Sequence, residues 1–243
     1  MTERLDLIAV GAHPDDVEIG CGGTLALLAG QGYRVGIVDL TDGEPTPGSP
    51  DVATRIAEAH SAAEVLQARR IILDFTNRAL FDTEEARIAL ATVIRRYQPA
   101  VVLGLAGRTP LASPDHWQAA QITDAAVFYS RLTKWDHRFD HLPPHKVQAQ
   151  AYYSLMHTEF QPFGKNQFVV DISSTLAEKM RAIRCYKTQF PPEKQYVLDR
   201  AESIAKAVGL AAGLEAGEVL TAVRTLATTD PMAMLLGSQP GGQ

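Results

Sequence analysis

The sequence predicts a single α/β domain of the Rossmann-like type, with a mostly parallel sheet and helices on both faces. The first observation behind this prediction is a near-continuous apolar run at residues 5–10, which is typical of a strand buried on both faces of a parallel sheet. The second is the alternation of such runs with helix-length segments through residue 105. The third is size, because 243 residues with 46% hydrophobic content suffice for one domain with a sizeable core.

The alternation can be followed element by element. The strand at 5–10 ends at Gly11, and a helix-length segment at 17–31 stops at Gly32 before a second apolar run at 34–40. These three elements form a βαβ unit. The pattern continues with expected helices at 51–67 and 83–96 and expected strands at 71–75 and 100–105.

The second half of the chain is less regular. Ser113 and Pro114 indicate the start of a helix that runs to about residue 129, because serine is a preferred N-cap and proline is favoured at the first helical position. Residues 135–145, with charges, histidines and a Pro-Pro pair, indicate a long loop. After it we expect strands at 151–156 and 168–172 and helices at 175–186 and 201–212. The domain spans 1–236, and we expect 237–243 to be a disordered tail.

Composition and charge restrict the possible partners. The net charge is only −5 and no run of like charges occurs, so we expect no nucleic-acid binding. Neither a signal peptide nor an apolar stretch long enough for a membrane span is found. The two cysteines, Cys21 and Cys185, cannot make a disulfide framework and lack a CxxC neighbour. We therefore expect a cytoplasmic protein that acts on a small molecule.

Two acidic and histidine-containing loops follow strands that the fold places side by side. Residues 13–16 read His-Pro-Asp-Asp after the first strand, and residues 113–116 read Ser-Pro-Asp-His after the fourth. In a doubly wound order such as 3-2-1-4 these strands are neighbours, and ligands bind beyond their carboxyl ends. His13, Asp16 and His116 can then supply three ligands for a catalytic zinc ion with an open position. The neighbouring Asp15 is a candidate general base, although spacing alone does not say which aspartate takes which role.

Ordinary structural roles compete with this interpretation. Asp16 can cap the following helix, and Asp115 and His116 can be first-turn helix residues, with the acid favoured by the helix dipole. The glycine-rich run at 20–23 lacks a Walker lysine and is not GxGxxG, so it is a weak nucleotide motif; close helix–sheet packing explains it better. The meeting of both loops at one crevice favours the metal site.

At this point the sequence resembles a known family. AHPDDVEIGCGGTL at residues 12–25 is similar to the signature of LmbE/PIG-L N-acetylglucosaminyl deacetylases, including those of bacillithiol synthesis. The resemblance continues at DLTDGE (39–44), at Arg55 and the helix after it, at PDH (114–116), at FVVDIS (168–173) and at YKTQF (186–190), and becomes thin after Pro191.

The resemblance implies roles for individual residues. It implies zinc ligands at His13, Asp16 and His116, a general base at Asp15 and an orienting partner at Asp115. It also implies that Glu44 and Arg55 bind sugar hydroxyls or an attached acid, although a solvated helix arginine is an equally ordinary explanation of Arg55. Family members commonly form oligomers, so we expect a homo-oligomer.

The sequence departs from the family pattern at two places. Ser113 stands where the family usually has the histidine that protonates the leaving amine, so Asp15 or His157 has to take that role. Thr-Asn-Arg at 76–78 replaces the usual Pro-Asp pair, which makes Asn77 a candidate for an altered sugar contact.

The sequence therefore predicts a zinc-dependent hydrolase that removes an N-acetyl group from an amino-sugar conjugate of the N-acetylglucosamine type. One alternative is a catalytically impaired protein of the same fold that binds zinc and a sugar conjugate, for which Ser113 is the argument. Another is a nucleotide-binding protein, supported only by the glycine run.

Overall fold

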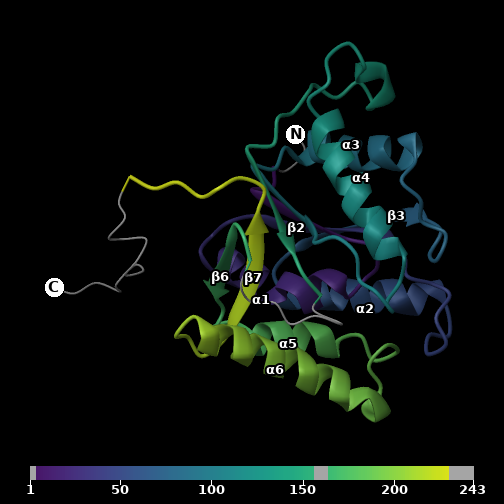
Figure 1. Ribbon diagram of the computed structural model, residues 1–243. Coiled ribbons are helices and arrows are strands. Elements are labelled where there is room, and N and C mark those ends of the chain that lie inside the picture. Colours follow the sequence, from purple (N-terminus) through teal and green to yellow (C-terminus); the bar gives the residue numbers. More distant parts are fainter. Residues whose placement is uncertain (1–3, 156–163, 230–243) are drawn as a thin grey trace.

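The computed structural model describes residues 4–155 and 164–229, which form a seven-stranded sheet with helices on both faces (Figure 1). The strands are β1 (Leu7–Gly11), β2 (Val35–Thr41), β3 (Arg69–Phe75), β4 (Val101–Leu105), β5 (Ala149–Tyr153), β6 (Gln167–Asp171) and β7 (Gly217–Ala222). The helices are α1 (Asp16–Gly30), α2 (Val52–Val65), α3 (Glu84–Tyr97), α4 (Asp115–Tyr129), α5 (Leu176–Arg184) and α6 (Gln195–Ala211), with short 3-10 turns η1 (Asp136–Arg138) and η2 (Pro192–Lys194).

The strand order confirms the predicted doubly wound arrangement. The sheet runs β3-β2-β1-β4-β5-β7-β6, and β1 pairs in parallel with both β2 and β4. Every residue of β1 and β2 is buried, as predicted for strands covered on both faces. The carboxyl ends of β1 and β4 therefore lie side by side, and the loops that leave them meet at the switch point.

Two groups of helices cover the sheet. On one side α3 packs against α4, and on the other α5 contacts α1, α2 and α6 (Figure 1). Close packing of α1 requires small residues, since a Cβ at Gly20 would lie 2.1 Å from the ring of Tyr153 on β5. This contact confirms that the glycine run serves helix–sheet packing.

The sequence did not predict β7. This strand lies between β5 and β6 and is antiparallel to both, so the sheet is mixed at this edge. Its residues follow α6 without the usual alternation, and β6 reaches the sheet only through them. The helix expected at 201–212 begins earlier, at Gln195, and the strand expected at 151–156 is displaced to Ala149–Tyr153.

The start of α4 also differs from the prediction by one residue. Pro114, and not Ser113, occupies the N-cap position, and the hydroxyl of Ser113 accepts a long hydrogen bond of 3.3 Å from the amide of Asp115. Ser113 thus serves the helix start from just outside it. The expected tail at 237–243 lies outside the described residues.

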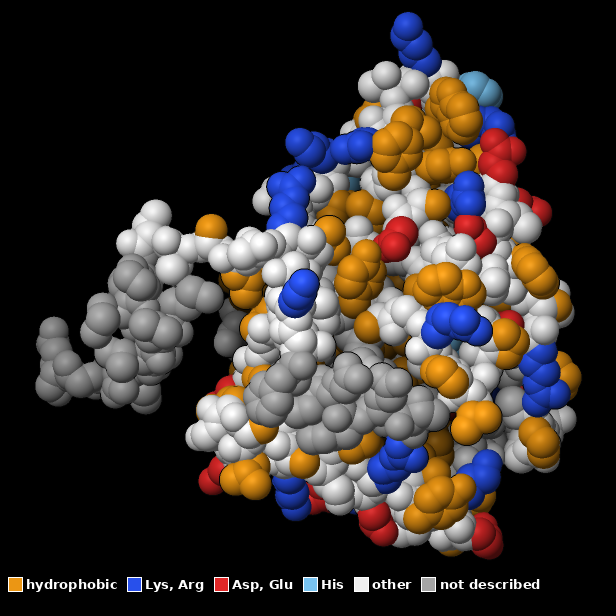
Figure 2. Space-filling model, viewed as in Figure 1, with side chains coloured by type: hydrophobic (Ala, Val, Ile, Leu, Met, Phe, Trp, Pro, Cys, Tyr) orange, Lys and Arg blue, Asp and Glu red, His pale blue; other side chains and the backbone are white. Residues whose placement is uncertain are grey.

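The surface and the helices give two further observations. Acidic and basic side chains are interspersed with hydrophobic ones on the face that Figure 2 shows, α4 included. Within residues 4–155 and 164–229, no helix is both long and apolar enough to cross a membrane.

Candidate metal centre and active site

The loop after β1 turns sharply at two adjacent aspartates. Asp15 has a positive φ of 106°, which is uncommon for a residue other than glycine, and its side chain makes no capping hydrogen bond to α1. Asp16 Oδ2 instead accepts hydrogen bonds of 3.0 Å from the amides of Ala12 and His13, which fixes its carboxylate against the loop. Capping of α1 by Asp16, the simpler explanation, is therefore not what the structure shows.

His13, Asp16 and His116 form a compact cluster at the ends of β1 and β4. One potential ligand atom of each lies within 4.8 Å of the others. His116 Nε2 is 3.2 Å from Asp16 Oδ1, and His13 Nδ1 is 3.6 Å from Asp16 Oδ2. The side chains are largely buried, with exposed fractions of 13% for His13, 5% for Asp16 and 6% for His116.

Both histidines are oriented by neighbours outside this cluster. Asp115 Oδ2 lies 3.2 Å from His13 Nε2 and also accepts a hydrogen bond of 2.6 Å from the amide of Arg78. Thr109 Oγ1 lies 2.8 Å from His116 Nδ1. Partners of this kind fix ring orientation in metal sites, and an orienting role of Asp115 remains a prediction.

The electrostatics of the cluster favour a cation. Burial lowers the pKa of His13, but its contacts with Asp115 and Asp16 outweigh burial and raise the pKa to about 10. Burial also disfavours ionisation of Asp16, yet His116 and His13 hold the pKa of that carboxyl well below its usual range. Carboxylates thus stabilise positive charge at this point, and one carboxylate with two imidazoles is a ligand set that suits zinc.

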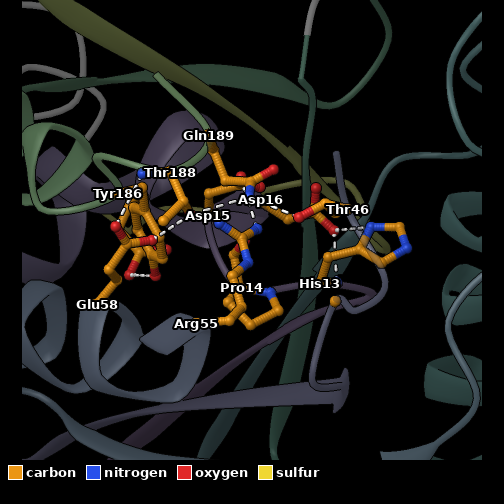
Figure 3. A network of polar contacts seen from close by, with 12 residues as sticks. His13, Pro14, Asp15, Asp16, Thr46, Arg55, Glu58, Tyr186, Thr188 and Gln189 are labelled. Atoms are coloured by element: carbon orange, nitrogen blue, oxygen red, sulfur yellow. Dashed lines mark hydrogen bonds and ion pairs between the residues drawn. The ribbon is translucent and has the colours of Figure 1, made fainter. Parts of the chain in front are cut away.

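Asp15 points to a different partner. Its Oδ2 accepts a hydrogen bond of 3.0 Å from Arg55 Nη2, and the same nitrogen also donates to the carbonyl oxygen of Pro14 (Figure 3). Burial raises the pKa of Asp15 to about 6, although Arg55 opposes the shift. A carboxylate with a pKa near neutrality, next to the cluster but not part of it, can accept a proton.

An open cavity of about 260 Å³ gives access to the cluster. Its lining includes His13, Asp15, Asp16 and His116 together with Arg55, Asn77 and Ser113. Gln189, Phe190 and Val197 complete another side of it. The site can therefore admit a small molecule to the cluster and to Asp15 at once.

Comparison with known proteins places this site in a family. The model of the PIG-L family, described as GlcNAc-PI de-N-acetylase, matches residues 8–127. A diacetylchitobiose deacetylase of Thermococcus kodakarensis is 33% identical over 198 residues, which are 77% of this chain and 71% of that protein. The chain belongs to the PIG-L family.

Relatives in this family differ in the reaction named for them. The crystal structure of N,N'-diacetylchitobiose deacetylase from Pyrococcus horikoshii superposes with a TM-score of 0.78 at 26% identity, covering 94% of this chain and 88% of that one. A 4-oxalmesaconate hydratase of Pseudomonas putida is 28% identical over 202 residues, 77% of this chain and 75% of that protein. One relative of this chain is thus named for a reaction other than deacetylation, and an assay has to distinguish the two.

The predicted substrate residues lie at different distances from the cavity of this PIG-L protein. Asn77 is buried, lines the cavity and donates a hydrogen bond of 2.7 Å to the carbonyl oxygen of Gly43. Glu44 is not among the lining residues, and both its carboxylate oxygens accept hydrogen bonds from Thr46. Arg55 is only 2% exposed and holds Asp15. His157 lies outside the described residues, and substrate binding by Glu44, Arg55 and Asn77 remains a prediction.

The segment after α5 supplies cavity residues to which sequence reasoning gave no role. Glu58 on α2 accepts hydrogen bonds of 2.8 and 2.6 Å from the amide and hydroxyl of Thr188, and Gln189 Nε2 donates to Thr46 Oγ1 at 2.9 Å (Figure 3). These bonds hold Gln189 at the cavity wall. The YKTQF motif was the available signal, but nothing in its sequence shows that it folds back over α2.

Proposed function

We propose that this protein is a zinc-dependent N-deacetylase, which hydrolyses the acetamido group of an amino-sugar conjugate of the N-acetylglucosamine type. The observation that carries the proposal is the meeting of His13, Asp16 and His116 with Asp15 in one open cavity of a PIG-L chain. Deacetylase relatives are named for diacetylchitobiose and for an inositol conjugate of 2-acetamido-2-deoxyglucose, which supports this substrate class.

His13, Asp16 and His116 would hold the ion. Bound there, zinc supplies Lewis-acid polarisation of the amide carbonyl and lowers the pKa of water. Asp115 keeps His13 in place through its contact with Nε2, and Thr109 does the same for His116. In the loop after β1, the hydrogen bonds from the amides of Ala12 and His13 to Asp16 keep His13 and Asp16 together.

Asp15 moves the proton in this proposal. It takes a proton from the attacking water as the new C–O bond forms at the carbonyl carbon. Breaking the C–N bond then requires a proton on the leaving nitrogen, which the Ser113 hydroxyl cannot donate at neutral pH. Asp15 returns the proton it received, so one water and one amide give acetic acid and an amine, which at neutral pH are acetate and an ammonium group. His157 remains the other candidate donor.

Substrate recognition and context complete the proposal. Asn77 and Arg55 line the cavity and are assigned to the hydroxyls or acidic substituent of the sugar, with Glu44 acting from the neighbouring loop. The cytoplasmic location and the homo-oligomer expected from the sequence belong to the same proposal, and light scattering of the purified protein tests the latter.

The decisive experiment measures acetate and free amine released by the zinc-loaded protein. Its panel contains N-acetylglucosamine, N,N'-diacetylchitobiose and an inositol conjugate of N-acetylglucosamine, with the metal-free protein as control. Metal-dependent release of acetate from any of these sugars is expected. No release with zinc fully bound would favour the impaired binding protein, and metal-dependent hydration of 4-oxalmesaconate instead would identify a hydratase.

A further inference from the structure

A second cavity adjoins the one that contains the metal cluster. It has a volume of about 230 Å³ and is formed by the loop after β4 and the first turn of α4. Its lining comprises residues 108–114 with Trp117 and Gln118. Ser113 lines both cavities. Thr109 lines the second cavity and contacts the ring of His116, which lines the first. The two cavities are therefore neighbours along one loop.

Two large apolar side chains of the second cavity face solvent. Trp117, the residue directly after His116, is 40% exposed, and Leu111 is fully exposed. Leu111 also has a positive φ of 67°, a backbone conformation that costs energy for a branched side chain. The exposed side chains of Leu111 and Trp117 thus form an apolar wall of the second cavity, beside His116.

We propose that the second cavity is a subsite for a second sugar ring of the substrate, with the indole of Trp117 as its platform. This inference rests on the proposed deacetylase function and extends it to an oligosaccharide-type substrate. A pyranose presents an apolar C–H face, which an aromatic ring covers well, and hydroxyls at its rim. Arg108 and Gln118 supply polar groups at the edge of the same cavity.

The position of Ser113 supports a single substrate that spans both cavities. Its small side chain separates them, so a ring whose acetamido group lies at the cluster can continue into the second cavity without a bulky residue between. Trp117 and His116 are consecutive on α4, which fixes the platform relative to the cluster. The distance between them therefore does not depend on a mobile connection.

A kinetic comparison tests the subsite through specificity. We expect Trp117→Ala to lower the ratio of kcat/KM for N,N'-diacetylchitobiose to that for N-acetylglucosamine by roughly two- to ten-fold, mainly through KM. Trp117→Phe should retain most of the ratio. The matched control is Trp135→Ala, because Trp135 is similarly exposed at 37% but packs on Tyr129, away from both cavities. An unchanged ratio in Trp117→Ala overturns the proposal.

A binding measurement decides the question without turnover. The chain has two tryptophans, so Trp135→Phe leaves Trp117 as the only indole and Trp117→Phe leaves Trp135. In the zinc-loaded Asp15→Asn background, N,N'-diacetylchitobiose should change the emission of Trp117 saturably and leave that of Trp135 unaltered. No saturable change at Trp117, or an equal change at Trp135, contradicts the subsite. Acetate release by the protein with Asp15 intact, without such a change in Trp117 emission, leaves the proposed function intact. Binding at Trp117, with no acetate release by the protein that retains Asp15, refutes the function alone.

Discussion

Asp15 and Asp16 are adjacent in the chain but face different partners. Asp15 has a positive φ, and its carboxylate contacts Arg55. The carboxylate of Asp16 lies between the rings of His13 and His116. Spacing alone leaves the two roles open, because either side chain can reach a metal from this loop. The observed directions support the assignment of Asp16 as a ligand and Asp15 as the base.

Removal of one ligand tests the metal centre. His116→Ala should reduce bound zinc to well below one equivalent, because only two ligands of the cluster remain. Elemental analysis of the folded protein measures this. His145→Ala is the control, since His145 contacts the carbonyl oxygen of Pro99, which precedes β4, whereas His116 follows that strand. Wild-type zinc content in folded His116→Ala would show that the ligand set is wrong.

Replacement of the base separates metal binding from catalysis. Asp15→Asn should keep zinc and lose about 10²–10⁴-fold in kcat, the usual contribution of a general base. Steady-state kinetics and metal analysis of the same sample check both parts. Asp124→Asn, which alters a carboxylate bonded to Gln150 and Tyr152, should leave the rate unchanged. Loss of zinc in Asp15→Asn would instead exchange the roles of the two aspartates.

The missing acid can be supplied at Ser113. Ser113→His should raise kcat on N-acetylglucosamine, because an imidazole at the cavity wall can protonate the leaving amine, and the pH–rate profile should gain a steeper alkaline limb. The acidic limb should remain, since Asp15 must be ionised and its pKa is raised to about 6, so the rate falls as the pH drops through that region. A variant with an unaltered rate and alkaline limb would show that proton donation does not limit turnover.

At the scale of elements, the long connection between α4 and β5 depends on one arginine. Arg95 on α3 is 1% exposed and donates hydrogen bonds to the carbonyl oxygens of Ser130, Leu132 and Leu142 and to Asp136. Its guanidinium also lies 3.9 Å from the centroid of the Phe139 ring. A loop without a strand or a full helix is thereby given a fixed path over the domain.

A neighbouring pair of arginines tests this role. Arg95→Met should lower the free energy of unfolding by about 2–4 kcal/mol, since one buried and two half-buried carbonyl groups lose their donor. Arg96→Met should cost at most about 1 kcal/mol, because its ion pair with Asp140 is exposed on both sides. Urea denaturation of the two variants measures the difference. Equal losses would mean that Arg95 does not organise the loop.

At the scale of the whole molecule, a buried ion pair connects β7, which the sequence did not predict, to α1 and α5. Glu218 on β7 accepts hydrogen bonds from the amides of Gly23 and Thr24, from the Thr24 hydroxyl and from Lys179 on α5. Both ionic side chains are 3% exposed. β7 is thus bonded to α1, the helix that begins at Asp16.

Neutralisation of this pair should destabilise the fold. Glu218→Gln leaves the Lys179 ammonium group buried without a counter-charge, so we expect a loss of about 3–5 kcal/mol in the free energy of unfolding. Glu218→Gln combined with Lys179→Met should recover part of that loss, because the uncompensated charge is gone. Chemical denaturation checks both variants. A loss below about 1 kcal/mol in the single variant would rule out a structural role for the pair.

The sequence by itself determined the parallel half of the fold and the meeting of His13, Asp16 and His116. Buried parallel strands are continuous apolar runs, and their order brings the loops at 13–16 and 113–116 together without any further information. For this reason the positions of β1 to β4 and the convergence of His13, Asp16 and His116 could be predicted.

The tertiary structure decided what depends on contacts distant in sequence. The sequence did not predict β7. Its place between β5 and β6 depends on strand pairing and on the hydrogen bonds of Glu218, both of which join it to residues distant in sequence. Gln189 reaches the cavity wall because Thr188 bonds to Glu58 on α2. The second cavity forms where the loop after β4 and the first turn of α4 leave Leu111 and Trp117 exposed. Periodicity reports which face of an element is buried, whereas side-chain hydrogen bonds between elements leave no periodic signal in the sequence.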